Sequence, residues 1–387
     1  MMKRRVTWGV LGLVCILLII IQPPLPPRIG EIDFRAYWGS SLLLSRGESF
    51  ADLNRLFVVE REYTNWTEDY PMVAWSPPWL SVLLLPYAFV SFERAKWLWL
   101  LTNIALVQIS TVLLWRDACA SHSSCHRFIW IALVAVFTFS MTLVALIAGQ
   151  VNTLVLLGLA GFLFFSKERR EVLTGLSLAL TLSKPQLVYL TFPILVLELV
   201  HARRWRALGG CVGWLLLLIL AVFVLSPAWL SDYWQMFSLG LAVERETPTL
   251  SGMMLVFFST TWAKWFPLVA LPIMLLCWYR WRTHLNLRSW IDISLLVGIP
   301  TASFGWSYDQ IMLCIPLLSL IAWMVQAQLE YRDSILLALI LIIGNLVTFY
   351  QRILTPSEVY FFWVPILILV VYAYAMMRWS RRRLAYA

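Results

Sequence analysis

The sequence predicts an all-α, polytopic integral membrane protein, and three observations support that fold class. Apolar residues make up 61% of the 387-residue chain, charged residues make up 13%, and the mean hydropathy is +0.77. Apolar runs of roughly 20 residues, long enough to cross a bilayer, recur from one end of the chain to the other. The 22 tryptophans and 14 tyrosines are of the kind enriched where helices meet the lipid–water boundary. A soluble fold could not bury this much apolar surface, so we expect a membrane protein.

The first apolar segment, residues 7–22, follows the basic tripeptide Lys3-Arg4-Arg5. This arrangement resembles a signal peptide, but the proline-rich residues 22–27 offer no small-residue cleavage site. We therefore expect an uncleaved first span with a cytoplasmic N-terminus, because basic flanks stay on the cytoplasmic side.

Basic clusters mark the other cytoplasmic ends and place about twelve spans in all. The expected spans lie near residues 7–22, 97–115, 128–147, 151–165, 171–185, 186–200, 207–225, 263–280, 290–304, 310–328, 334–350 and 359–377. Both termini are then cytoplasmic, and little sequence remains between spans, so we expect one membrane domain over residues 1–387. Lysine and arginine gather in the inner connections, so the net charge of +9 gives no reason to expect nucleic-acid binding.

One apolar segment, residues 75–90, does not fit this count of spans. It is short and contains Pro77, Pro78 and Pro86. If it crossed the membrane, the arginine-rich connections after it would lie outside. We expect it to dip into the bilayer or to lie along it, where protein or a water-filled cavity must cover its backbone.

Two long outer regions result, residues 23–96 and 226–262, and the first contains a candidate catalytic carboxylate. Asp33 follows the first span closely, and the aromatic and basic run that comes next contains Arg35 and Tyr37 as candidate substrate contacts. A solvated loop with an interfacial helix would contain the same residue types, so this region alone does not separate the two interpretations.

Polar residues at three other outer positions are candidate substrate contacts. A lysine at the bilayer centre costs roughly 2.5–3.5 kcal/mol, so Lys184 is expected at an outer helix end, facing an anion or a cavity, or snorkelling to the surface. Gln150 and Asn152 lie in a tight turn, where amides bind hydroxyl groups or cap helices.

The late outer turn and the second outer region supply the remaining candidates. The late turn contains Trp306, Tyr308, Asp309 and Gln310, the aromatic, acidic and amide side chains typical of sugar sites, although interfacial aromatics with a capping aspartate would look the same. Arg245, in the second outer region, has the fork geometry that holds phosphate, but a solvated charge is the commoner role of such a residue.

The six cysteines give no sign of a disulfide or of a metal site. None lies in a connection placed outside, so we expect no structural disulfide. The Cys119, His122, Cys125 and His126 cluster matches no common zinc spacing, so we expect no metal and no cofactor.

From Asp33 to about Pro316 these features together resemble the membrane glycosyltransferases of glycosyltransferase family 87. The shared pieces are D-F-R-A-Y from Asp33 with Gly47 downstream, the stretch 70–86 with its paired prolines, G-Q-V-N at 149–152, the stretch 175–185 ending S-K-P, and G-W-S-Y-D-Q at 305–310. The resemblance implies a GT-C-type architecture with its long outer loop after the first span. It also implies a polyprenyl-phosphate sugar donor, with mannose as the default sugar, and a lipid or glycan acceptor. Reference members have a histidine pair where this chain has Tyr308-Asp309, which leaves the sugar open.

The resemblance also implies an inverting transfer on the outer face of the cell membrane, with Asp33 as the general base. One carboxylate suffices, because a lipid phosphate is already a good leaving group, whereas glycosidases need two carboxyls. Lys184, Arg35 and Arg245 are then candidates for contacting the departing phosphate, and the lipid chain is expected along residues 75–90. The alternatives are a transporter or flippase, a lipid-carrier O-antigen ligase or polymerase, and a non-catalytic scaffold.

Overall fold

The computed structural model describes residues 29–120, 123–238, 246–355 and 357–386. Within these ranges the chain is helical and contains no strand. The α-helices are α2 (Asp33–Ser45), α3 (Leu53–Thr64), α4 (Leu80–Leu83), α5 (Leu85–Ala88), α6 (Phe92–Ala118), α7 (Ile129–Thr138), α8 (Ser140–Ala148), α9 (Asn152–Lys167), α10 (Glu171–Thr181), α11 (Thr191–His201), α12 (Trp205–Leu225), α13 (Trp229–Ser238), α14 (Leu250–Phe258), α15 (Phe266–Trp281), α16 (Leu287–Thr301), α17 (Cys314–Val325), α18 (Tyr331–Leu354) and α19 (Trp363–Tyr386). The 3-10 helices are η1 (Ser123–Phe128), η2 (Pro185–Leu187), η3 (Trp262–Trp265), η4 (Ser307–Leu313) and η5 (Glu358–Phe361).

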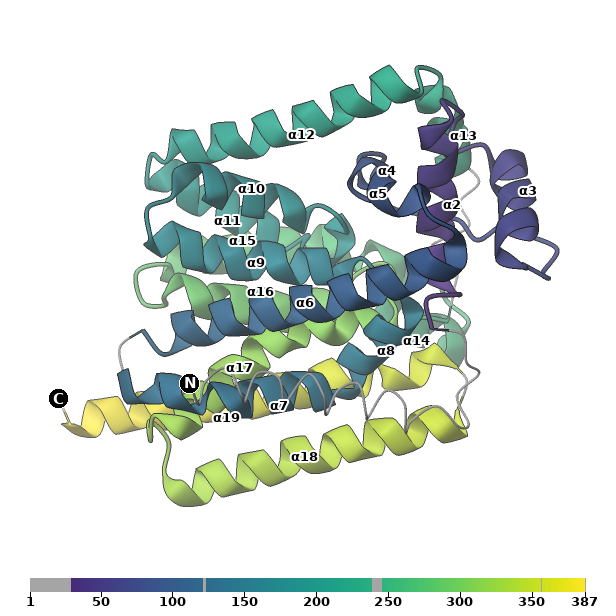
Figure 1. Ribbon diagram of the computed structural model, residues 1–387. Helices are drawn as coiled ribbons and strands as arrows, with labels where there is room; N and C mark the ends of the chain where they lie inside the picture. The colour runs from purple at the N-terminus through teal and green to yellow at the C-terminus, as the bar shows by residue number, and fades with distance from the viewer. Residues whose placement is uncertain (1–28, 121–122, 239–245, 356, 387) are drawn as a thin grey trace.

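The long apolar helices run side by side, and α2 lies across one of their ends (Figure 1). Helices α3, α13 and α14 are found at the same end of the molecule as α2 (Figure 1). We call this the α2 end and the other the far end. These helices therefore cover one end of a helical bundle.

Six helical segments are long and apolar enough to cross a membrane, among the residues that the structure describes. They are Phe92–Ala118, Trp205–Leu225, Trp262–Trp281, Ser307–Val325, Tyr331–Leu354 and Glu358–Arg381, and α7 with α8, bent by 61°, would make a seventh. Helices appear at every expected span except residues 7–22, which lie outside the described residues. Four of them are short: α9 has 16 residues, α16 has 15, and α10 and α11 have 11 each. Eleven helical residues rise about 16 Å, roughly half the hydrocarbon thickness. Hydropathy thus located the helices but not their lengths.

The bend between α7 and α8 is stabilised by a side chain from α18. Asn345 Oδ1 accepts a hydrogen bond from the backbone N–H of Ser140 at 2.9 Å, and its Nδ2 donates to the carbonyl of Thr138 at 2.8 Å. Backbone groups freed at a helix break need such partners, because the bilayer offers them no water.

Helix α2 is anchored on α6 by buried aromatic rings. The Phe34 ring stacks on Phe92 and Trp99, with centroids 6.2 and 5.8 Å away, and Phe34 is fully buried. The Trp38 indole donates to the carbonyl of Tyr87, which follows α4 in the short helix α5, at 3.0 Å. The segment 75–90 therefore packs against α2 as two one-turn helices and is not among the candidate spans, while its dip into the bilayer stays a prediction.

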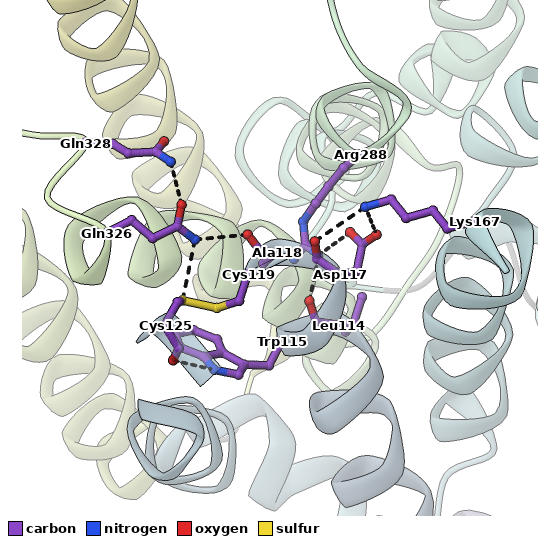
Figure 2. The surroundings of a disulfide bond; sticks show 10 residues. All are labelled: Leu114, Trp115, Asp117, Ala118, Cys119, Cys125, Lys167, Arg288, Gln326 and Gln328. Atoms are coloured by element: carbon purple, nitrogen blue, oxygen red, sulfur yellow. Dashed lines mark hydrogen bonds and ion pairs between the residues drawn. A yellow bond between two sulfur atoms is a disulfide. The ribbon is translucent and has the colours of Figure 1, made fainter. Parts of the chain in front are cut away.

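The expectation of no structural disulfide was wrong. Cys119, at the C-terminal end of α6, is joined to Cys125 in η1, with an S–S distance of 1.96 Å (Figure 2). The chain reverses direction after α6 and brings the two Cα atoms to 5.5 Å, within the range that a disulfide bridges. The expectation considered only the compartment and not this reversal. No group of three or more possible metal ligands occurs among the described residues, and His122 lies outside them.

Candidate active site

Lys184 lies at a break between two short helices at the α2 end. Helix α10 ends at Thr181, and Pro185 prevents the helix from continuing through Lys184. The side chain is 7% exposed, and its ammonium group donates to Asp309 Oδ1 at 2.6 Å and to Gln150 Oε1 at 3.0 Å. The buried cation is therefore paired with a carboxylate and with an amide.

Asp309 uses its two oxygen atoms for different purposes. Oδ1 forms the ion pair with Lys184, and Oδ2 accepts the backbone N–H of Trp306 at 2.9 Å, which closes the first turn of η4. The Tyr308 ring lies beside the pair, with its centroid 4.8 Å from the Lys184 ammonium nitrogen. The late turn thus presents an acid and an aromatic ring to Lys184.

Gln150 connects the Lys184 pair to α2. Its Oε1 accepts hydrogen bonds from Tyr37 Oη at 3.2 Å and from Lys184, and its side chain also bonds to the Asp33 carboxylate. Because the amide oxygen already accepts two bonds, the amide N–H₂ group is the donor to Asp33. Gln150 therefore lies between the carboxylate and the cation.

Gly149 allows α2 to approach this turn closely. Its φ is +72°, a left-handed conformation that favours glycine. A Cβ atom at this position would lie 2.7 Å from the Cβ of Phe34. The neighbouring Trp99 indole also donates to the Gly149 carbonyl at 2.8 Å, so the turn and α2 are held together at one point.

Asp33, the first residue of α2, is partly exposed and lies beside this group. Burial raises the pKa of its carboxyl to about 6, and the hydrogen bond from Gln150 and the charge of Lys184 oppose that rise. The negative charges of Asp309 and Glu358 raise it further. A carboxyl with a pKa near the working pH is suited to accept a proton during a reaction.

The structure brings six of the sequence-predicted residues together, and the others have different surroundings. Those together are Asp33, Tyr37, Gln150, Lys184, Tyr308 and Asp309. Trp306 lies next to them, its ring centroid 6.2 Å from that of Tyr308. Arg245 lies outside the described residues.

Three other candidates have contacts within the protein. Arg35 donates to the carbonyl of Thr64 at 3.0 Å and lies 4.4 Å from the centroid of the Trp66 ring, which places it with α3 rather than with Lys184. Asn152 donates to the Tyr308 carbonyl at 2.7 Å, and Gln310 donates to the Phe361 carbonyl at 3.1 Å. These last two amides hold the late turn in place.

Sequence reasoning missed a second ion pair at the late turn, between Arg352 of α18 and Glu358 of η5. The Arg352 guanidinium donates to both Glu358 and the hydroxyl of Ser307, and Glu358 accepts the Ser307 N–H at 3.0 Å. The sequence does contain a signal for this pair, because Arg352 and Glu358 both lie in the short connection between the last two expected spans. It was passed over because hydropathy gives that connection no role.

The comparison with protein families identifies the chain. The family model for glycosyltransferase family 87 matches residues 76–303, more than half of the sequence. The match includes Gln150, Asn152 and Lys184, whereas Asp33 and Asp309 lie outside it. No curated protein and no solved structure matches the chain. The family indicates a membrane glycosyltransferase, in agreement with the apolar helices and the polar group at one end of the bundle, and the chain belongs to glycosyltransferase family 87.

Proposed function

We propose that the protein transfers a sugar from a polyprenyl-phosphate donor to an acceptor hydroxyl, with inversion at the anomeric carbon and Asp33 as the general base. The observation that carries this proposal is the bridge made by Gln150, which contacts both the Asp33 carboxylate and the Lys184 ammonium group. A base and a cation held on one amide match the two charges of the reaction, the acceptor proton and the departing phosphate.

The chemistry requires one base and no separate acid. The acceptor oxygen forms a bond to the anomeric carbon while its proton passes to Asp33. The bond between that carbon and the phosphate oxygen breaks, and the phosphate leaves with the electron pair. A positioned base of this kind typically contributes 10²–10⁴-fold to the rate.

Lys184 is the cation best placed to contact the departing phosphate. An ammonium group has three donor hydrogens, and Asp309 and Gln150 accept two of them. The third is available for a phosphate oxygen. Arg35 does not share this role in our proposal, because its guanidinium contacts Thr64 and Trp66.

We further propose that the α2 end faces outward in a twelve-span, GT-C-type arrangement with both termini in the cytoplasm. The helix boundaries support this orientation, because basic residues gather at the far end. They lie at the C-terminal end of α9 (Lys167 to Arg170), where α11 is followed by α12 (Arg203 to Arg206), directly after α15 (Arg282), and in the last turns of α19 (Arg378 and Arg381). Such residues stay on the cytoplasmic side of a membrane.

The donor's lipid chain is proposed to lie in the groove between α15 and α16, of about 750 Å³. Its walls are almost entirely apolar and include Ala270, Ile273 and Val297. It reaches Thr301, whose hydroxyl bonds to that of Tyr189 at 2.6 Å, five residues after Lys184 in the chain. The groove therefore leads to the two segments that contain Lys184 and Asp309, which favours it over residues 75–90 for the lipid.

Transfer of labelled mannose from polyprenyl-phosphate-mannose tests the proposal, with membranes containing the wild type or Asp33→Asn. We expect label in the lipid-extractable or glycan fraction for the wild type, and at least ~100-fold less for the variant at equal protein level. Near-normal turnover by the variant would remove Asp33 as the base. Transfer from polyprenyl-phosphate-glucose or -arabinose instead would change only the sugar. Uptake of a substrate without a covalent product would favour a transporter.

A further inference from the structure

We propose that Arg352 and Glu358 are positioning residues for the reaction, which hold the late turn against Lys184 and adjust the electrostatics at Asp33. This inference rests on the proposed function. Both residues lie outside the part of the chain that the family model matches.

The geometry at Ser307 is the first argument. Its backbone N–H donates to Glu358 Oε2 at 3.0 Å, and its hydroxyl accepts from Arg352. Ser307 is fully buried and lies two residues before Asp309 in the same 3-10 helix. Two of its polar groups are thus held by one ion pair, which fixes the helix that presents Tyr308 and Asp309.

The late turn is also connected to the ion pair through Phe361. The Arg352 guanidinium lies 3.9 Å from the centroid of the Phe361 ring, and the Phe361 carbonyl accepts from Gln310 at 3.1 Å. The late turn is therefore joined to the connection between α18 and α19 at Ser307 and at Gln310, on either side of Asp309. A change in this connection would move the Asp309 carboxylate relative to Lys184.

Electrostatics provide the second argument. The charged and titratable groups that interact with Asp33 are Tyr37 on its own helix, Lys184 before η2, Tyr308 and Asp309 in η4, and Glu358 in η5. The negative charge of Glu358 raises the pKa of Asp33, and the Arg352 charge beside Glu358 partly cancels that effect. The two members of the pair thus act on Asp33 with opposite signs.

Opposite signs give a test that a purely structural role would not satisfy. Glu358→Gln should lower the pKa of Asp33, because it removes a negative charge and leaves Arg352 unpaired. Arg352→Gln should raise it, because Glu358 is then unpaired. We expect each shift to be at least ~0.3 pH unit, the effect of one unit charge at about 10 Å in a water-like dielectric.

The measurement is an infrared titration of the Asp33 carboxyl band, obtained by subtracting the same protein with Asp33→Asn, alongside the pH profile of kcat/KM. Glu171→Gln is the matched control. It breaks the Arg204–Glu171 pair, whose side chains are 12% and 24% exposed, against 17% and 22% for Arg352 and Glu358. This control should leave the Asp33 band unshifted.

Opposite shifts in the two variants, with reduced kcat and normal folding, would support the proposal. Shifts of the same sign, or none, would overturn it. If a variant fails to fold, the conservative variants Glu358→Asp and Arg352→Lys replace it. Each keeps the charge, so the pKa of Asp33 should stay at its wild-type value while kcat is reduced. An unchanged kcat in both conservative variants would overturn the proposal. Band shifts without transfer by the wild type would refute the proposed function while the electrostatic link to Asp33 stands.

Discussion

Lys184 and Asp309 are 125 positions apart in the chain, yet their side chains form a 2.6 Å ion pair with almost no exposure to solvent. Each residue lies at a break in helical structure, Lys184 directly before Pro185 and Asp309 in the first turn of η4. A buried charge is strongly destabilising without a partner of opposite sign, so each residue offsets the cost of burying the other.

Removing one member of this pair should destabilise the protein by about 3–5 kcal/mol, because the other charge is left buried and unpaired. Lys184→Ala and Asp309→Asn are therefore expected to unfold at lower SDS fractions in detergent titrations. The double variant Lys184→Met/Asp309→Leu should be more stable than either single variant but inactive, since Lys184 is proposed to contact the phosphate. Arg61→Ala, which breaks an exposed 3.2 Å pair with Asp69, should have no measurable effect on unfolding. A double variant that is less stable than both single variants would contradict the role of the pair in stability.

The pH dependence of transfer should report the raised pKa of Asp33. The base must be ionised to accept a proton, so kcat/KM should fall as the pH decreases through about 6 and should be level above that value until another group titrates. An ordinary, exposed aspartate would instead lose its function near pH 4. Initial rates between pH 4 and 8 decide between the two. An acid limb near pH 4 would show that the base is not a carboxylate with the raised pKa of Asp33.

Gly149→Ala should cost about 1–3 kcal/mol and reduce transfer. The new Cβ atom would lie 2.7 Å from that of Phe34 in a left-handed turn, so α2 and Asp33 must move away from Gln150. Gly213→Ala in α12 is the control, because nothing lies within 4 Å of a Cβ atom there. That control should be as stable as the wild type or slightly more so. Equal effects of the two substitutions on unfolding and on transfer would disprove the close approach.

Ala270→Trp should obstruct the proposed lipid groove between α15 and α16. We expect the KM for a long-chain polyprenyl-phosphate donor to rise about tenfold, which is about 1.4 kcal/mol of lost apolar contact. The KM for a donor with a ten-carbon chain should rise less, because a short chain makes fewer contacts along the groove. The matched control is Ala338→Trp, in the apolar groove formed by α7, α17, α18 and α19. An effect from that control, or from Val82→Trp in the segment 75–90 instead, would place the lipid elsewhere.

The sequence by itself determined the class of the protein and predicted residues for the candidate site. Apolar runs located the helices, since hydropathy is a local property that one stretch of chain carries alone. Short polar stretches between apolar segments predicted Asp33, Gln150, Lys184 and Asp309 as candidate site residues. Polar groups beside or within a membrane are energetically costly, so they commonly have a partner or a function. The family match agrees with the class of the protein, and its range includes Gln150 and Lys184 but not Asp33 or Asp309.

Only the tertiary structure decided which polar groups meet. It paired Lys184 with Asp309, directed Arg35 toward Trp66, and placed Asn345 at the bend between α7 and α8. It also joined Cys119 to Cys125 and brought the connection between α18 and α19 to the late turn. These contacts depend on how helices far apart in the chain pack and on where each one ends. Neither property can be predicted from local hydropathy, because the hydropathy of one segment does not indicate which residue of another segment its polar side chains contact.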